Sequence, residues 1–135
     1  MQSSTQSAPV SGKTRWTGIV ISALPALFLV VDAVIKLMKP APVVEATVKL
    51  GYPESVIVPL GIVLLICTIL YVVPRISVLG AILLTGYLGG AVATHVRVGD
   101  PLFSHVLFPV YLGVMIWLGL YLRDERLRAL VPLRS

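Results

Sequence analysis

Four apolar segments constrain the fold of this chain more than any other feature. They span residues 17–37, 55–73, 76–96 and 102–122. Each is close to the roughly 20 residues that an α-helix needs to cross about 30 Å of hydrocarbon. The composition agrees, because 57% of the 135 residues are hydrophobic and only 13% are charged, whereas a soluble domain has about 25% charged residues. The sequence therefore predicts an all-α membrane protein, a four-helix transmembrane bundle embedded in the lipid bilayer.

The segments between the apolar runs predict how the helices are connected. Only Pro74 and Arg75 separate the second and third helices, and the turn RVGDP, residues 97–101, separates the third and fourth. Connections this short indicate antiparallel hairpins. The first connection is longer and contains PVVEATVKL, residues 42–50, which begins with proline and is followed by glycine. Since proline favours helix starts and glycine favours helix ends, we expect a short interfacial helix there.

The polar start of the chain is expected to stay outside the bundle. Residues 1–12, MQSSTQSAPVSG, have no apolar periodicity, which is typical of a disordered tail. A single domain is then expected over residues 13–135. The first apolar run is too long for the core of a cleaved signal peptide, so we expect it to remain as the first span.

The positions of the basic residues predict the topology. Four crossings place both termini on one side, and that side carries seven basic residues: Lys13, Arg15, Arg75, Arg123, Arg126, Arg128 and Arg134. The other side carries four: Lys36, Lys39, Lys49 and Arg97. The positive-inside bias therefore predicts cytoplasmic termini in a cell (inner) membrane. Because the net charge of +5 comes from residues at segment ends, it indicates lipid contact and excludes nucleic acid as a partner.

Polar side chains gather at the non-cytoplasmic end of the predicted bundle. Such groups near hydrocarbon are costly, so each usually has a partner or a function. The candidate ligand-binding residues are Asp32, Lys36, His95, Arg97, Asp100 and His105. Asp32 and Lys36 have the i,i+4 spacing of a helical ion pair. They either only neutralise each other, or Asp32 also orients a histidine or a ligand.

Two histidines flank the RVGDP turn, and an antiparallel hairpin would bring His95 and His105 to a similar depth. They could ligate haem or a metal, hydrogen-bond a quinone carbonyl, relay protons with Asp32, or serve only as interfacial residues. No HExxH or CxxC spacing is present, and Cys67 is the only cysteine. We therefore expect no metal site, disfavour haem and keep quinone as the candidate ligand. Without a nucleophile elbow, phosphate loop or dinucleotide fingerprint, a stand-alone enzyme is not expected and catalytic residues stay unassigned.

The third apolar segment is rich in glycine. Gly86, Gly89 and Gly90 belong to small-residue stripes that let membrane helices approach closely. We predict that they pack helices within the bundle. Dimerisation through this helix and a crevice for a flat ligand are the alternatives.

The chain resembles the DoxX-like membrane proteins over about residues 15–133. The resemblance rests on Leu50-Gly51-Tyr52-Pro53, on LLTGYLGGAVATHVRVGDP and on the ending LGLYLRDERLRALVP. It implies a four-helix integral membrane bundle. The namesake of the family is a small subunit of a thiosulfate:quinone oxidoreductase, and other members are linked to membrane redox complexes. Many relatives carry a glutamate in the second helix, whereas LGIVLLICTILYVV, residues 60–73, has none.

The polar cluster and the resemblance together suggest an accessory or quinone-binding subunit of a membrane redox system, with a redox-complex protein as partner. A small-solute or proton transporter acting as a homo-oligomer is the second hypothesis, because four helices are few for a transport path. A structural assembly partner without a ligand is the third.

Overall fold

The computed structural model describes residues 11–130, which are helical over nearly their whole length. In chain order the elements are α1 (Gly12–Met38), α2 (Ala41–Lys49), η2 (Glu54–Val56), α3 (Ile57–Val72), η3 (Pro74–Ile76), α4 (Ser77–Val98), η4 (Leu102–Val106), α5 (Phe108–Arg123) and α6 (Glu125–Leu130). Within this part of the chain, four stretches are long and apolar enough to span a membrane: Gly12–Met38, Glu54–Val72, Pro74–Val98 and Leu102–Arg123. The predicted fold, including the short helix after the first span, is confirmed.

Two predicted boundaries differ from those observed. Helix α1 begins at Gly12 rather than at residue 17, because the Ser11 hydroxyl caps it and accepts a hydrogen bond from the Thr14 amide at 3.2 Å. The predicted tail otherwise lies outside the described residues. The fourth span is not one α-helix: the π-turn η4 precedes α5. Since Pro109 cannot donate a backbone hydrogen bond to residue 105, a continuous α-helix is interrupted there.

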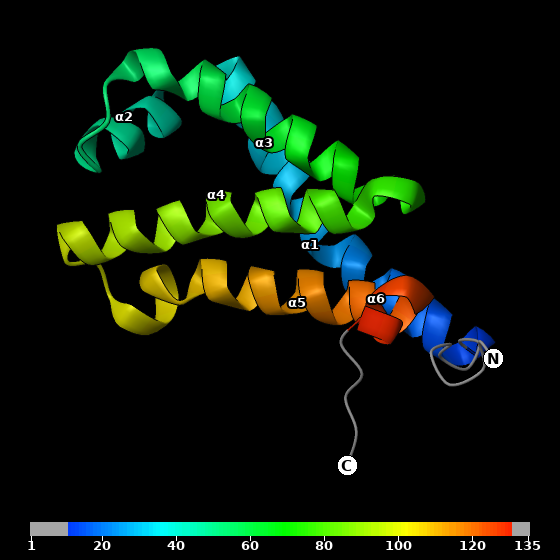
Figure 1. Ribbon diagram of the computed structural model, residues 1–135. Helices are drawn as coiled ribbons and strands as arrows, with labels where there is room; N and C mark the ends of the chain where they lie inside the picture. The colour runs from blue at the N-terminus through cyan, green and yellow to red at the C-terminus, as the bar shows by residue number, and fades with distance from the viewer. Residues whose placement is uncertain (1–10, 131–135) are drawn as a thin grey trace.

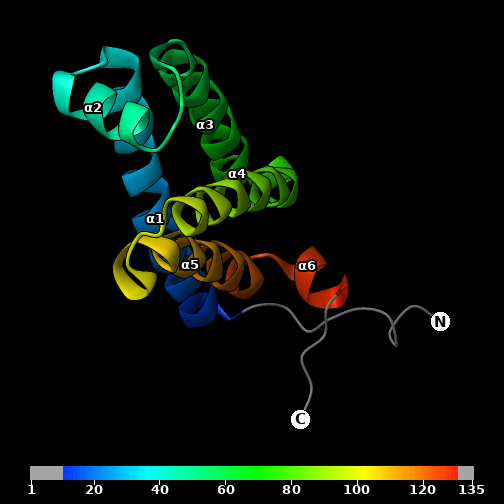
Figure 2. The ribbon, with the colours of Figure 1, turned by 90° about the vertical axis from the view of Figure 1, so that its left-hand side faces the viewer.

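The four spanning helices form a ring. Helix α1 packs against α3 and α5, and α4 packs against the same two helices. Figure 1 shows α4 and α5 side by side, with α1 crossing behind them and α3 diverging from α4 beyond the turn that joins them. We call the end where α1 begins and α5 finishes the terminal end. The opposite end, with α2, η2, the last turn of α4 and η4, is the α2 end and faces the viewer in Figure 2.

Close helix contacts hold the ring together. Leu29, Leu64 and Leu84 are at most 2% exposed at its centre. Gly80 lets α4 approach the backbone of α3 at Tyr71, and Gly18 and Gly119 let α1 and α5 meet in the same way. Large apolar side chains remain exposed around the outside, as expected of a surface that faces lipid. Since lipid tails are as apolar as leucine, packing of this kind is what drives helices together in a membrane.

Candidate functional site

The two histidines lie together at the α2 end. The ring centroids of His95 and His105 are 5.7 Å apart, in an edge-to-face arrangement. His95 Nδ1 lies 2.6 Å from Asp100 Oδ2, and His105 Nδ1 lies 2.8 Å from the Ser104 hydroxyl. Both rings use Nδ1 in these contacts, and within residues 11–130 no hydrogen bond involves either Nε2. Each ring therefore keeps one nitrogen for another molecule.

The π-turn places His105 beside His95. Gly99, with φ of 76°, ends α4 in the left-handed conformation that favours glycine. The Asp100 amide then donates to the His95 carbonyl at 3.1 Å. This backbone hydrogen bond holds the Asp100 carboxylate next to the His95 imidazole. The chain reverses through Pro101 and η4 and brings His105 back to this position. The RVGDP turn thus builds the His95–Asp100–His105 cluster, which we call the histidine cluster.

The other predicted site residues form separate contacts at the same end. Lys36 Nζ lies 2.7 Å from Asp32 Oδ2 on α1, which is the predicted i,i+4 ion pair. Lys39 makes a second ion pair with Glu54, at 3.1 Å. Among residues 11–130, no hydrogen bond or ion pair joins these pairs to the histidine cluster. All predicted polar residues thus share one end of the bundle, but they form local pairs rather than one network.

Arg97 has a structural contact that its position in the sequence did not suggest. Its guanidinium donates to the Leu50 carbonyl at 2.7 Å and lies against Gly51, whose φ is 95°. Beside it, the Tyr52 hydroxyl lies 2.6 Å from the Thr94 hydroxyl. These contacts fasten the segment after α2 to the last turns of α4.

The glycines predicted to pack helices do not do so within the described chain. A Cβ atom added to Gly86, Gly89 or Gly90 would have no neighbouring atom within 4 Å. The intrachain packing prediction is therefore wrong for these three positions, because α4 turns its Gly80–Leu84–Leu88 face toward the bundle instead. Gly86, Gly89 and Gly90 are instead exposed on the outer side of α4.

An apolar groove lies between α4 and α5, and Gly89 is in its lining. It has a volume of about 640 Å³ and is open toward the lipid. Its lining comprises Thr85, Leu88, Gly89, Val92, Pro109, Val110, Gly113, Val114, Trp117, Leu118, Tyr121 and Leu127. At 1.5 Å per residue, its α5 wall from Pro109 to Tyr121 is about 18 Å long. The groove therefore suits an elongated apolar molecule.

Two polar side chains of the groove, Thr85 and Trp117, are hydrogen-bonded. Trp117 Nε1 donates to the Thr85 hydroxyl at 2.8 Å, and that hydroxyl donates to the Ala81 carbonyl at 2.7 Å. This leaves little for a polar ligand to bind within the groove. The groove end at Val92 and Pro109, however, is three residues from His95 along α4 and four residues from His105 across the junction of η4 and α5. An apolar slot and a polar group with free imidazole nitrogens are thus adjacent.

Comparison with known proteins supplies the family. A model described as the DoxX-like family matches residues 20–119. The chain belongs to the DoxX-like family. No curated protein and no solved structure matches it. The family match and the four spans together make this DoxX-like chain a multi-pass membrane protein.

The sequence analysis kept a crevice at the glycine stripe only as an alternative, and it did not predict that α5 forms the second wall of the groove in this DoxX-like protein. Trp117 and Tyr121 look like ordinary packing or interfacial aromatics in the sequence, and the groove depends on how α4 and α5 are rotated relative to each other. One signal was available: Gly89 and Gly113 place small residues on both members of the last hairpin. Within the described residues, no group of three histidine, cysteine, aspartate or glutamate side chains could hold a metal.

Proposed function

We propose that this DoxX-like protein binds a quinone-like molecule as a subunit of a membrane redox system. The observation that carries the proposal is the 640 Å³ groove, whose lining reaches Val92, three residues before His95 of the histidine cluster on α4. An isoprenoid or alkyl tail would lie along Gly89, Gly113 and Trp117. The head of the molecule would lie at the histidines, near the membrane interface.

The histidine cluster has the chemistry that a quinone head requires. Asp100 orients His95 through Nδ1, so Nε2 points to the remaining partner. A neutral imidazole accepts from a quinol hydroxyl at Nε2, whereas an imidazolium donates to a quinone carbonyl. The same nitrogen can therefore serve both redox states of the ligand. Asp32–Lys36 and Arg97 contribute charge at this end of the bundle, and their structural contacts leave them a supporting role.

Trp117 provides a direct test of tail binding. The chain has two tryptophans, and Trp16 at the far end of α1 is 66% exposed. In a Trp16→Phe background, Trp117 becomes the sole reporter. A benzoquinone whose alkyl tail carries bromine atoms, which quench indole on contact, is expected to quench its fluorescence saturably, because the tail and the indole would share the groove. Linear quenching equal to that of free tryptophan in the same detergent would refute binding.

A matched pair of variants tests whether the groove is the site. Gly89→Leu places a side chain in the groove, whereas Gly86→Leu adds the same bulk to the same helix outside its lining. Saturable quenching should be lost in the first variant and kept in the second. Equal effects of the two variants would contradict this location.

Removing a histidine tests the head position. His95→Phe should weaken quinone affinity by about tenfold, the effect of losing one charge-assisted hydrogen bond. Phe keeps the ring against His105 and removes Nε2. Unchanged affinity in both His95→Phe and His105→Phe would restrict the proposal to an apolar tail site.

We further propose cytoplasmic termini in the cell membrane, on the seven-to-four excess of basic residues that the sequence assigns to the side of the termini. In a Cys67→Ala background, Ser104→Cys should react with a membrane-impermeant maleimide in intact cells, and Ser11→Cys only after lysis. The reverse pattern would invert the topology.

A further inference from the structure

A second cleft lies at the terminal end of the bundle. It has a volume of about 340 Å³ and is lined by Arg15, Ile19, Pro74, Arg123, Asp124, Glu125 and Arg126. The first turn of α1, the turn η3 and the break between α5 and α6 meet there. Three arginines from two distant parts of the chain thus converge on one depression.

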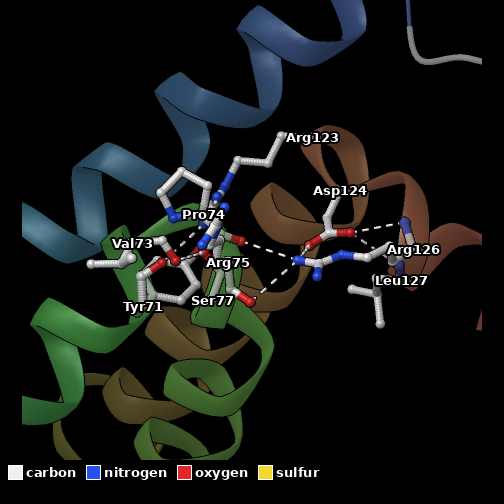
Figure 3. A network of polar contacts seen from close by, with 9 residues as sticks. All are labelled: Tyr71, Val73, Pro74, Arg75, Ser77, Arg123, Asp124, Arg126 and Leu127. Carbon is white, nitrogen blue, oxygen red and sulfur yellow. Dashed lines mark hydrogen bonds and ion pairs between the residues drawn. The ribbon is translucent and has the colours of Figure 1, made fainter.

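Arg123 is the most enclosed of these cations. Its Nε donates to Ser22 Oγ at 3.0 Å, and the two terminal nitrogens lie 3.4 Å from Ser77 Oγ and from the Tyr71 carbonyl. The guanidinium also stacks over the Tyr71 ring, at 5.1 Å from the centroid. Figure 3 shows Arg123, Tyr71 and Ser77 together at this end.

All of these partners are neutral, so the charge of Arg123 is uncompensated. Among residues 11–130, no carboxylate lies within ion-pair distance of its guanidinium. A guanidinium has five N–H donors, and the three contacts use one on each nitrogen. Both terminal nitrogens therefore keep one donor each, and charged N–H donors of this kind bind phosphate and carboxylate oxygens.

The neighbouring acid, Asp124, does not pair with Arg123, because it binds other groups. Asp124 Oδ1 accepts from the amides of Arg126 and Leu127, at 2.8 and 3.2 Å, and so caps α6. Its other oxygen lies 3.5 Å from the Arg126 guanidinium, which also donates to the Pro74 carbonyl at 3.1 Å (Figure 3). The two acids and three arginines lining the cleft leave an excess of one positive charge. One anionic headgroup would neutralise this excess.

The cleft lies at the depth of the lipid headgroups. The spans Pro74–Val98 and Leu102–Arg123 each have one end in its lining. Trp16, next to Arg15 and exposed, is the residue type that marks the membrane interface. Anionic lipids in this layer attract arginine electrostatically.

We infer that the terminal cleft binds the phosphate of an anionic phospholipid, with Arg123 and Arg15 donating to its oxygens. The bound lipid would bridge the start of α1 and the end of α5, and would neutralise the charge on Arg123. The site lies at the opposite end of the bundle from the proposed quinone head, so either proposal can fail without the other.

The test uses the full-length protein in nanodiscs of phosphatidylcholine with or without a minority of phosphatidylglycerol, released into native mass spectrometry. Wild-type protein should retain phosphatidylglycerol in preference to phosphatidylcholine. Arg15→Gln should lower the retained fraction by about tenfold. Arg15 is the informative position, because it is exposed and its loss leaves the contacts of Arg123 intact.

Lys13→Gln is the matched control, because it removes the same charge from the same turn of α1 and Lys13 does not line the cleft. It should change retention by less than twofold. Equal losses in Arg15→Gln and Lys13→Gln would overturn the proposal in favour of a diffuse surface charge. Stabilisation in detergent by inorganic phosphate alone, equal to that by phosphatidylglycerol, would show that the site binds soluble phosphate and would overturn the lipid assignment.

Discussion

Replacing Gly80 by alanine should weaken the bundle, whereas the same change at Gly90 should not. Both glycines lie within α4. A Cβ atom at Gly80 would lie 2.5 Å from the Tyr71 Cα and 2.7 Å from the Leu70 carbonyl carbon of α3. One at Gly90 would have no neighbour within 4 Å. The pair therefore isolates helix contact from the general effect of removing a glycine.

The expected loss of stability in Gly80→Ala follows from how far the new Cβ atom would lie inside the normal packing distance. Carbon atoms pack at about 3.5–4.0 Å, so α3 and α4 would have to separate by about 1 Å at this point. Overpacking typically costs about 1–3 kcal/mol. Since the obstacle at Gly80 is backbone, which cannot rotate away, we expect about 3 kcal/mol of lost unfolding free energy. Gly90→Ala should be neutral or stabilising by up to about 1 kcal/mol, the helix preference of alanine over glycine.

The assay is unfolding by sodium dodecyl sulphate in mixed micelles, followed by circular dichroism. Gly80→Ala should unfold at a clearly lower detergent fraction than wild type. If Gly90→Ala were as destabilising as Gly80→Ala, the assignment of the packing face of α4 would be refuted, and the Gly86–Gly90 surface would have to contact another helix.

Three further changes test named contacts. Tyr71→Phe should lower the unfolding free energy by about 1 kcal/mol in the same assay, because the buried Tyr71 hydroxyl donates to the Ile116 carbonyl at 2.7 Å. Asp124→Ala should cost about 1 kcal/mol and accelerate deuterium exchange in α6, whose first amides it caps; unchanged exchange there would contradict the cap. Tyr52→Phe should accelerate exchange in residues 50–56 and leave α5 unchanged, because it breaks the contact with Thr94.

The architecture could be predicted from the sequence because the bilayer allows few solutions. A helix must satisfy its own backbone in hydrocarbon, so apolar length predicted all four spans, and turn chemistry predicted the α3–α4 and α4–α5 hairpins. The exact ends of the helices were harder to predict from the sequence. Ser11 extended α1 through a single capping hydroxyl, and Pro109 broke the fourth helix.

The candidate site was only partly predictable. The sequence placed His95 and His105 together, because a five-residue turn joins their helices. It did not show that Arg97 bonds to the Leu50 carbonyl. It also assigned Gly89 to packing, since a small-residue stripe looks the same whether a helix or open space lies against it. The rotation of α4 about its own axis decides which residues face the other helices. That rotation depends on the packing of all the helices together.

The central claim is that a quinone-like tail lies in the groove between α4 and α5. A quinone with a photoreactive group on its alkyl tail, irradiated with the protein in nanodiscs and mapped by peptide mass spectrometry, tests it most directly. Labelling should concentrate on groove residues such as Val110, Val114 and Leu118, and Gly89→Leu should abolish it. Labelling spread over exposed residues of α1 and α3, such as Leu27 and Ile66, to the same extent as over the groove would contradict the claim.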